Sequence, residues 1–193
     1  KVLATVKDRA ALCGVSVKLV SETFEVLSVA VWLLDEQEGR LVLGASTAPQ
    51  SGRATDGCPP AAASTAVAAG LHGKSSPFNL EVVREPWAEE FRELNPAVFP
   101  NGGDRWCVPL RAGERSLGAL VLADRVNGAG YTGEQLQLLQ CIAGQVTSVL
   151  LNLRLADEVA RARELEAFRT MSAFFVHDLK NTAASLNLML INL

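Results

Sequence analysis

The sequence lacks two features that would assign it to a membrane or to nucleic acid. Its purely apolar stretches, such as residues 29–34, are far shorter than the roughly 20 residues of a membrane-spanning helix. Lys and Arg form no dense run, and the formal net charge is -3, so the attraction that DNA or RNA binding requires is missing. We therefore expect no membrane span in this chain and no nucleic-acid partner.

Cysteine is scarce and shows no short pairing of the C-x-x-C kind. The four cysteines are Cys13, Cys58, Cys107 and Cys141. This spacing predicts reduced thiols and no metal site. A redox-sensing or catalytic thiol is the alternative, and Cys58 is its first candidate because Gly57 and Pro59 place it in an accessible loop.

The chain also lacks an initiating Met and a leader peptide, since it begins at Lys1 and ends at Leu193 inside a helical pattern. We interpret it as a fragment that is itself cytoplasmic. Membrane contact, including an inner-membrane anchor of the parent protein, would come only through segments outside it.

The composition, 49% hydrophobic and 20% charged, predicts a folded domain rather than a disordered chain. Apolar spacing predicts helical segments in residues 1–27, interrupted near Gly14, and short helices in residues 61–71 and 86–94. The pattern also predicts two hairpins, whose strands cover residues 28–35 with 41–45 and residues 105–110 with 116–124. Together these elements predict an α+β sheet with helices packed on one side.

A long helix is predicted after the second hairpin. Thr132 is its expected N-cap, with Gln135 as the capping-box partner. No proline follows, and no glycine follows Gly144, so the helix is expected to continue to the end of the chain.

The second hairpin and the helix after it resemble the end of a GAF domain. The similarity rests on Trp106-Cys107-Val108-Pro109-Leu110, on residues 117–122, and on Tyr131-Thr132-Gly133-Glu134-Gln135-Leu136 with the helix that they open. It implies a GAF sensor domain over residues 1–155, an α+β fold with an antiparallel sheet and flanking helices. The ligand is unknown; a small molecule between the sheet and residues 46–95 and a GAF domain that only dimerises both stay open.

Residues 156–193 are predicted to form a signalling helix and a truncated dimerisation helix. From Ile142 onward, mostly apolar residues recur at spacings of four and three, the seam of a coiled coil, and predict a homodimer. One series is Ile142, Val146, Val149, Leu153, Ala156 and Ala160; the other is Phe168, Ser172, Phe175, Leu179, Thr182, Leu186, Met189 and Leu193. The rhythm slips by one residue between Ala160 and Phe168, which alters supercoiling locally.

His177 is the residue with the most distinctive chemistry. It lies two places after the seam residue Phe175 and should point outward, where its imidazole could act as a nucleophile. Asp178 could orient or deprotonate the ring. Asn181 lies one turn later on the same face and could position a water or a phosphoryl oxygen.

The run His177-Asp178-Leu179-Lys180-Asn181 resembles the phosphoacceptor box of sensor histidine kinases. After a GAF domain, it is similar to the sensor kinases of the PEP-CTERM/exosortase system. The resemblance implies that His177 accepts the γ-phosphoryl of ATP and passes it to a response-regulator aspartate, with Asp178 as acid/base or orienting residue and Asn181 in positioning or phosphatase chemistry. ATP and Mg would be bound by a domain of the full-length parent, so the fragment alone should be inactive.

Two other interpretations remain open at this point. One is a stand-alone GAF module that binds a small molecule or uses a thiol, similar to free methionine sulfoxide reductases, with Cys58 or Cys107 as the reactive residue. The other is a GAF regulator in which His177 is incidental. His72 is expected to be exposed in a flexible loop, without a haem.

Overall fold

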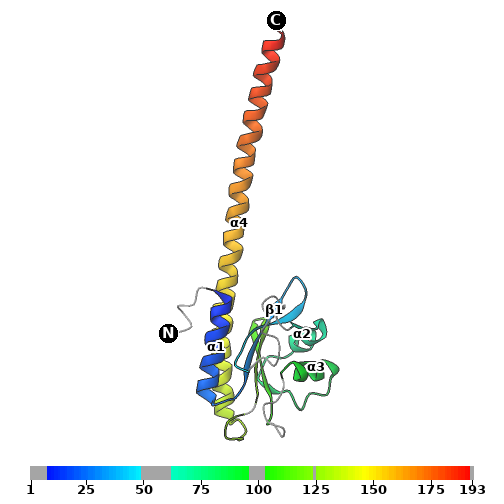
Figure 1. Cartoon of the computed structure of the whole chain (residues 1–193), viewed down its shortest axis with the longest axis vertical. Helices are drawn as coiled ribbons and strands as arrows, with labels where there is room; N and C mark the ends of the chain where they lie inside the picture. The colour runs from blue at the N-terminus through cyan, green and yellow to red at the C-terminus, as the bar shows by residue number, and fades with distance from the viewer. Residues whose placement is uncertain (1–7, 49–61, 96–102, 124, 192–193) are drawn as a thin grey trace. The chain divides into compact units, whose positions relative to one another are not determined.

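The computed structural model describes residues 8–48, 62–95, 103–123 and 125–191. The chain divides into two compact units, residues 1–153 and residues 154–193, whereas the sequence predicted the boundary at residue 155. The first unit is an α+β domain, and the second is the continuation of its last helix (Figure 1).

The elements follow the predicted order, with two short strands added. They are α1 (Arg9–Phe24), β1 (Val29–Asp35), β2 (Arg40–Ser46), β3 (Ala62–Ala63), α2 (Thr65–His72), β4 (Phe78–Asn79), α3 (Pro86–Leu94), β5 (Trp106–Ala112), β6 (Arg115–Leu122) and α4 (Gly133–Ile191). Both predicted hairpins are confirmed as antiparallel pairs, β1 with β2 and β5 with β6. Helix α3 has the predicted bounds, with Pro86 in its first turn.

Helix α2 begins later than the sequence predicted. Ala62 and Ala63 pair with Val42 and Leu41 as strand β3, and α2 starts only at Thr65. The predicted helix start after Pro60 lies outside the described residues. Pairing with β2 therefore places Ala62 and Ala63 in a strand, although their Ala-rich sequence favours a helix.

The six strands form one antiparallel sheet in the order β3-β2-β1-β6-β5-β4. Its centre is the pairing of β1 with β6, in which Val31 lies opposite Leu120. Strand β6 carries the longest run of buried residues in the sheet, six, and β1 and β5 carry four each. Strands with both faces covered by the protein are apolar on both faces, because neither side contacts water.

Helices cover both faces of the sheet, so the prediction of helices on one side only was wrong. Alternate residues of β1 point to opposite faces. Val29 and Val31 pack with α1 and the first half of α4, whereas Ala30 and Trp32 pack with α2 and α3 (Figure 1). The helices between the two hairpins, α2 and α3, thus form the second helical layer of the domain.

Helix α1 runs without a break through Gly14, which the sequence predicted as an interruption. A Cβ atom at Gly14 would meet nothing within 4 Å, and the helix is held instead by buried Leu12, Val17 and Phe24. Packing of an amphipathic face outweighs the low helix propensity of one exposed glycine.

The predicted capping box at the start of α4 is confirmed. The Thr132 amide donates to Gln135 Oε1 at 3.0 Å, and the Gln135 amide donates to Thr132 Oγ1 at 3.3 Å. Arg125 also donates to Gln135 Oε1 and lies over the Tyr131 ring, with 5.4 Å from its Cζ to the ring centroid. The helix then continues without interruption to Ile191, as predicted.

The first half of α4 belongs to the domain core, which corrects the predicted dimer seam. Leu139, Ala143, Val146 and Leu150 are buried, so Val146 is a core residue and not a seam residue. Ile142, Val149 and Leu153 pack at the margin of the same core. By length and composition α4 could cross a membrane, with a mean hydropathy of 1.3 in its most apolar window. Of that window, 28% is buried inside the protein.

Candidate functional site

The side chains of His177, Asp178 and Asn181 lie together on the exposed part of α4. His177 Nδ1 is 3.2 Å from Asn181 Nδ2 and 3.7 Å from Asp178 Oδ1. The side chains of His177 and Asp178 are 72% and 79% exposed. The spacing of four residues stacks Asn181 one helical turn after the ring. A nucleophilic imidazole, a carboxylate and an amide are therefore gathered on a surface that an external donor can reach.

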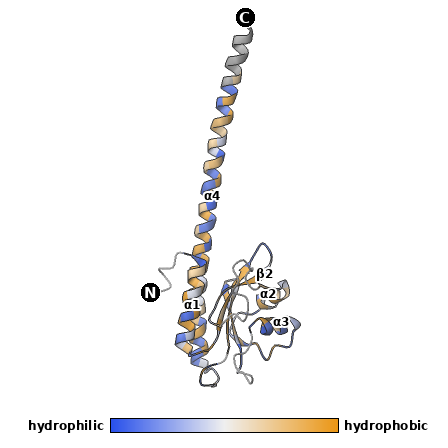
Figure 2. Ribbon diagram, viewed as in Figure 1, coloured by the Kyte–Doolittle hydropathy of each residue, from blue (hydrophilic) through white to orange (hydrophobic). Residues whose placement is uncertain are grey.

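A broad apolar surface runs along the same part of α4, as the hydropathy colouring shows (Figure 2). Its large exposed members are Leu165, Phe168, Met171, Phe174, Phe175, Val176 and Leu179, each between 51% and 69% exposed. His177 is two residues from both Phe175 and Leu179, which corresponds to about 160° around the helix. The ring thus lies on the side opposite these two residues. The predicted seam residues Thr182, Leu186, Met189 and Leu193 lie outside the described side chains.

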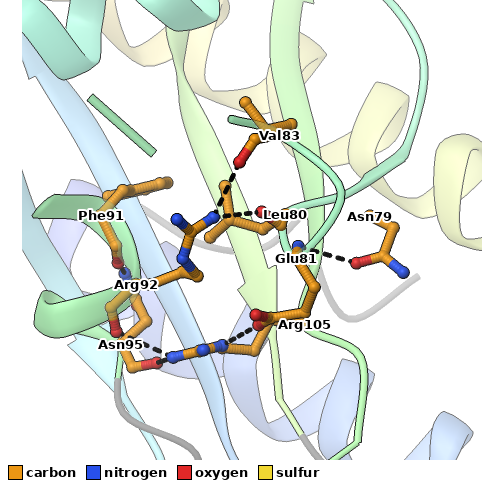
Figure 3. Close-up of polar contacts among 8 residues, drawn as sticks. All are labelled: Asn79, Leu80, Glu81, Val83, Phe91, Arg92, Asn95 and Arg105. Carbon is orange, nitrogen blue, oxygen red and sulfur yellow. Dashed lines mark hydrogen bonds and ion pairs between the residues drawn. The ribbon is translucent and has the colours of Figure 1, made fainter. Parts of the chain in front are cut away.

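On the α2–α3 face of the sheet, a polar network joins three elements that are distant in sequence (Figure 3). Arg105 precedes β5, forms an ion pair with Glu81 and donates to the carbonyl oxygens of Arg92 and Asn95. The Arg92 guanidinium donates to the carbonyl oxygens of Leu80 and Val83 at 2.7 and 3.0 Å. The sequence analysis missed this network, because nothing in the local pattern connects residues 81, 92 and 105.

The network continues into the apolar core through Asn95 and Trp32. Trp32 Nε1 donates to Asn95 Oδ1 at 2.9 Å, and Asn95 Nδ2 donates to the Phe91 carbonyl at 2.8 Å. The Trp32 and Phe91 rings are fully buried, with centroids 5.5 Å apart. On this face the sequence analysis left room for a small ligand, and the two large aromatic side chains of Trp32 and Phe91 are buried there.

Two of the three cysteines that the structure describes, Cys13 and Cys107, are buried and do not resemble reactive thiols. Cys107 is fully buried, and this desolvation raises the pKa of its thiol. Burial also raises the pKa of Cys13 to about 11. Cys141 is exposed. Because the thiolate is the reactive form, Cys107 is unsuited to the redox role considered above. Cys58 lies outside the described residues.

His72 is exposed, as expected, although it is the last residue of α2 and not part of a loop. Its carbonyl oxygen accepts a hydrogen bond from Arg111. Within the described ranges, no group of three His, Cys, Asp or Glu side chains is arranged to hold a metal ion.

The chain thus has an α+β domain with an antiparallel sheet, two helices on each face and a long exit helix. The family model described as GAF domain matches residues 11–152. The chain therefore belongs to the GAF domain family. A search of curated protein sequences finds no match.

Solved GAF structures share this fold at low sequence identity. A GAF domain from an Acinetobacter phosphoenolpyruvate-protein phosphotransferase has a TM-score of 0.58 at 16% identity, covering 79% of this chain and 88% of that one. A domain of a putative two-component sensor histidine kinase from Sinorhizobium meliloti 1021 has 0.53 at 15%, covering 81% and 99%. Free methionine-R-sulfoxide reductase from Neisseria meningitidis, solved with its substrate, has 0.55 at 18%, covering 80% and 85%. At these identities, the similarity to proteins of such different activity shows the fold alone.

Proposed function

We propose that this chain is the sensor and phosphoacceptor portion of a two-component histidine kinase, in which the GAF domain regulates phosphorylation of His177. The observation that carries the proposal is the exposed cluster of His177, Asp178 and Asn181 on a helix that leaves a GAF domain. The sensor-kinase domain from Sinorhizobium meliloti is one precedent for the fold in this setting.

The chemistry follows from an accessible imidazole. The lone pair of a ring nitrogen attacks the γ-phosphorus of ATP, the bond from that phosphorus to the bridging oxygen breaks, and ADP leaves. An aspartate carboxylate of a response regulator then takes the phosphoryl group and frees the imidazole. ATP and Mg belong to a further domain of the parent protein, so this chain by itself has no kinase activity. Asp178 orients the ring, and Asn181 serves in positioning or in phosphatase chemistry.

A finer assignment is to the sensor kinases of the PEP-CTERM/exosortase system. It rests on the resemblance of residues 177–181, placed after a GAF domain, and extends the proposal to a cytoplasmic unit whose parent is anchored at the inner membrane. The proposal would be supported by a response regulator of that system that accepts phosphate from His177.

Phosphoryl labelling of the full-length parent tests the proposal. Incubation with γ-labelled ATP should give an acid-labile label that the His177→Gln substitution abolishes. His72→Gln is the matched control, since His72 is the other histidine of this chain and is also exposed; it should label as the parent does. Undiminished labelling of His177→Gln would refute the assignment.

We also propose that the exposed apolar surface of α4 pairs with a second copy of the chain. Phe168, Phe175 and Leu179 are each more than 60% exposed and share one side of the helix. Covering such side chains is favourable by about 1.5–3 kcal/mol each.

Light scattering at about 50 µM should therefore show a homodimer. The double substitution Phe175→Lys and Leu179→Lys should weaken it at least about a hundredfold, from the loss of two such side chains per copy. Thr170→Lys, on another side of α4, should leave the dimer intact. If this chain without substitutions were monomeric, the result would contradict the proposal.

A further inference from the structure

We propose that Arg105 and Trp106, which are neighbours along the chain, couple the end of α3 to the start of α4, so that releasing the end of α3 loosens the capping box of α4. The inference concerns the GAF domain alone and goes beyond the proposed function, because it holds whether or not His177 accepts a phosphoryl group. It starts from the contacts that two adjacent side chains make on opposite faces of the sheet.

Arg105 holds the end of α3 on one face of the sheet. Its guanidinium donates to the carbonyl oxygens of Arg92 and Asn95 at 2.9 and 3.0 Å and forms an ion pair with Glu81 (Figure 3). Arg92 lies in the last turn of α3 and Asn95 is its C-cap. The last carbonyl groups of a helix lack a regular partner within it. Because the Arg105 side chain is only 15% exposed, it binds these carbonyl groups largely out of contact with water.

Trp106 contacts the segment before α4 on the other face of the sheet. Successive side chains of a strand point to opposite faces, and the Trp106 ring packs edge-on against Tyr131, with centroids 6.0 Å apart. Tyr131 also contacts Phe24 at the end of α1, with centroids 6.2 Å apart. Aromatic rings at these separations attract one another. A shift of the chain at Arg105 therefore displaces a ring against which Tyr131 packs.

Tyr131 is connected to the capping box through Arg125. The Arg125 guanidinium lies over the Tyr131 ring and donates to Gln135 Oε1 at 3.4 Å. The same oxygen accepts from the Thr132 amide at 3.0 Å. The position of the Tyr131 ring thus affects the cation that shares the capping oxygen with Thr132. A contiguous set of contacts leads from the end of α3 to the first turn of α4.

Amide hydrogen exchange of this chain, measured residue by residue by NMR, tests the coupling. Arg105→Lys keeps the positive charge beside Glu81 but removes the planar group that reaches two carbonyl oxygens. The amides of Thr132, Gln135 and Leu136 form the hydrogen bonds at the start of α4. They should exchange about two- to tenfold faster in the variant, the effect of weakening one aromatic contact.

Arg111→Lys is the matched control. Arg111 also lies on β5, and its guanidinium donates to the carbonyl oxygens of His72 and Lys74 at the end of α2. Arg111 is five residues further along the strand than Trp106. Its replacement should therefore perturb the α2–α3 layer without changing the exchange of the three capping amides. Equal acceleration by the two lysine variants would reflect a general loosening of the domain and would overturn the inference.

A Trp106→Leu background tests whether the coupling passes through the indole ring. Leucine keeps an apolar side chain at this position but removes the ring that contacts Tyr131. In this background Arg105→Lys should no longer change the three exchange rates, because a coupling that the ring carries is lost with the ring. The same acceleration with and without the ring would contradict the inference, as would unchanged rates in Arg105→Lys alone.

Discussion

Replacing Gly118 with alanine should destabilise the GAF domain more than other substitutions of similar size. Gly118 has a φ of +150°, a region that L-amino acids rarely adopt, and its Cβ atom would lie 2.0 Å from the Trp32 carbonyl oxygen. Backbone strain and overpacking each cost about 1–3 kcal/mol, so we expect a loss of about 2–6 kcal/mol. Urea unfolding of the chain measures it.

Gly14→Ala is the matched control, with the opposite sign expected. A methyl group at Gly14 meets nothing within 4 Å in the exposed side of α1, and alanine favours a helix over glycine by about 0.8–1 kcal/mol. Replacing glycine with alanine should thus stabilise α1 at position 14 and disrupt the pairing of β1 with β6 at position 118. A stable Gly118→Ala protein would show that β6 does not approach β1 as closely as described.

Replacing Trp32 with alanine should cost about 3–5 kcal/mol, the range for removing a large buried aromatic ring. The ring is fully buried and packs edge-on against Phe91 at 5.5 Å. Its loss opens a cavity on the α2–α3 face. It also leaves Asn95 Oδ1 without the donor that it has at 2.9 Å. Chemical unfolding measures the loss.

The Trp32→Phe substitution separates packing from hydrogen bonding. It keeps an aromatic ring against Phe91 but removes the indole N–H, and the unpaired oxygen of Asn95 should cost about 1–3 kcal/mol. Equal stability of the alanine and phenylalanine variants would mean that the ring contributes nothing beyond its N–H. Equal stability of Trp32→Ala and the parent would contradict the packing of the insert on the sheet.

The stability of the α2–α3 layer bears on the proposed signalling role. Arg105 joins α3 and the segment before it to β5, and β5 continues through β6 toward the capped start of α4. A stimulus that loosens the α2–α3 layer would therefore act on strands that lead into the helix carrying His177.

Local sequence determined most of the elements of this protein. The apolar runs of the two hairpins, the proline that opens α3 and the Thr132–Gln135 capping box each act within a few residues, so their outcome can be predicted from neighbours along the chain. The face shared by His177 and Asn181 is likewise a matter of helical spacing.

The tertiary structure alone decided how these elements meet. The pairing of β1 with β6, the second helical layer and the contact of Trp32 with Asn95 join residues that are far apart in sequence. The sequence predicted Val146 as a dimer residue, whereas it is buried in the domain core. Heptad spacing shows which residues are apolar but not which surface covers them. The sequence also could not predict that α1 continues through Gly14. Packing of the buried face of α1 outweighs the preference of glycine against a helix, which is worth about 1 kcal/mol.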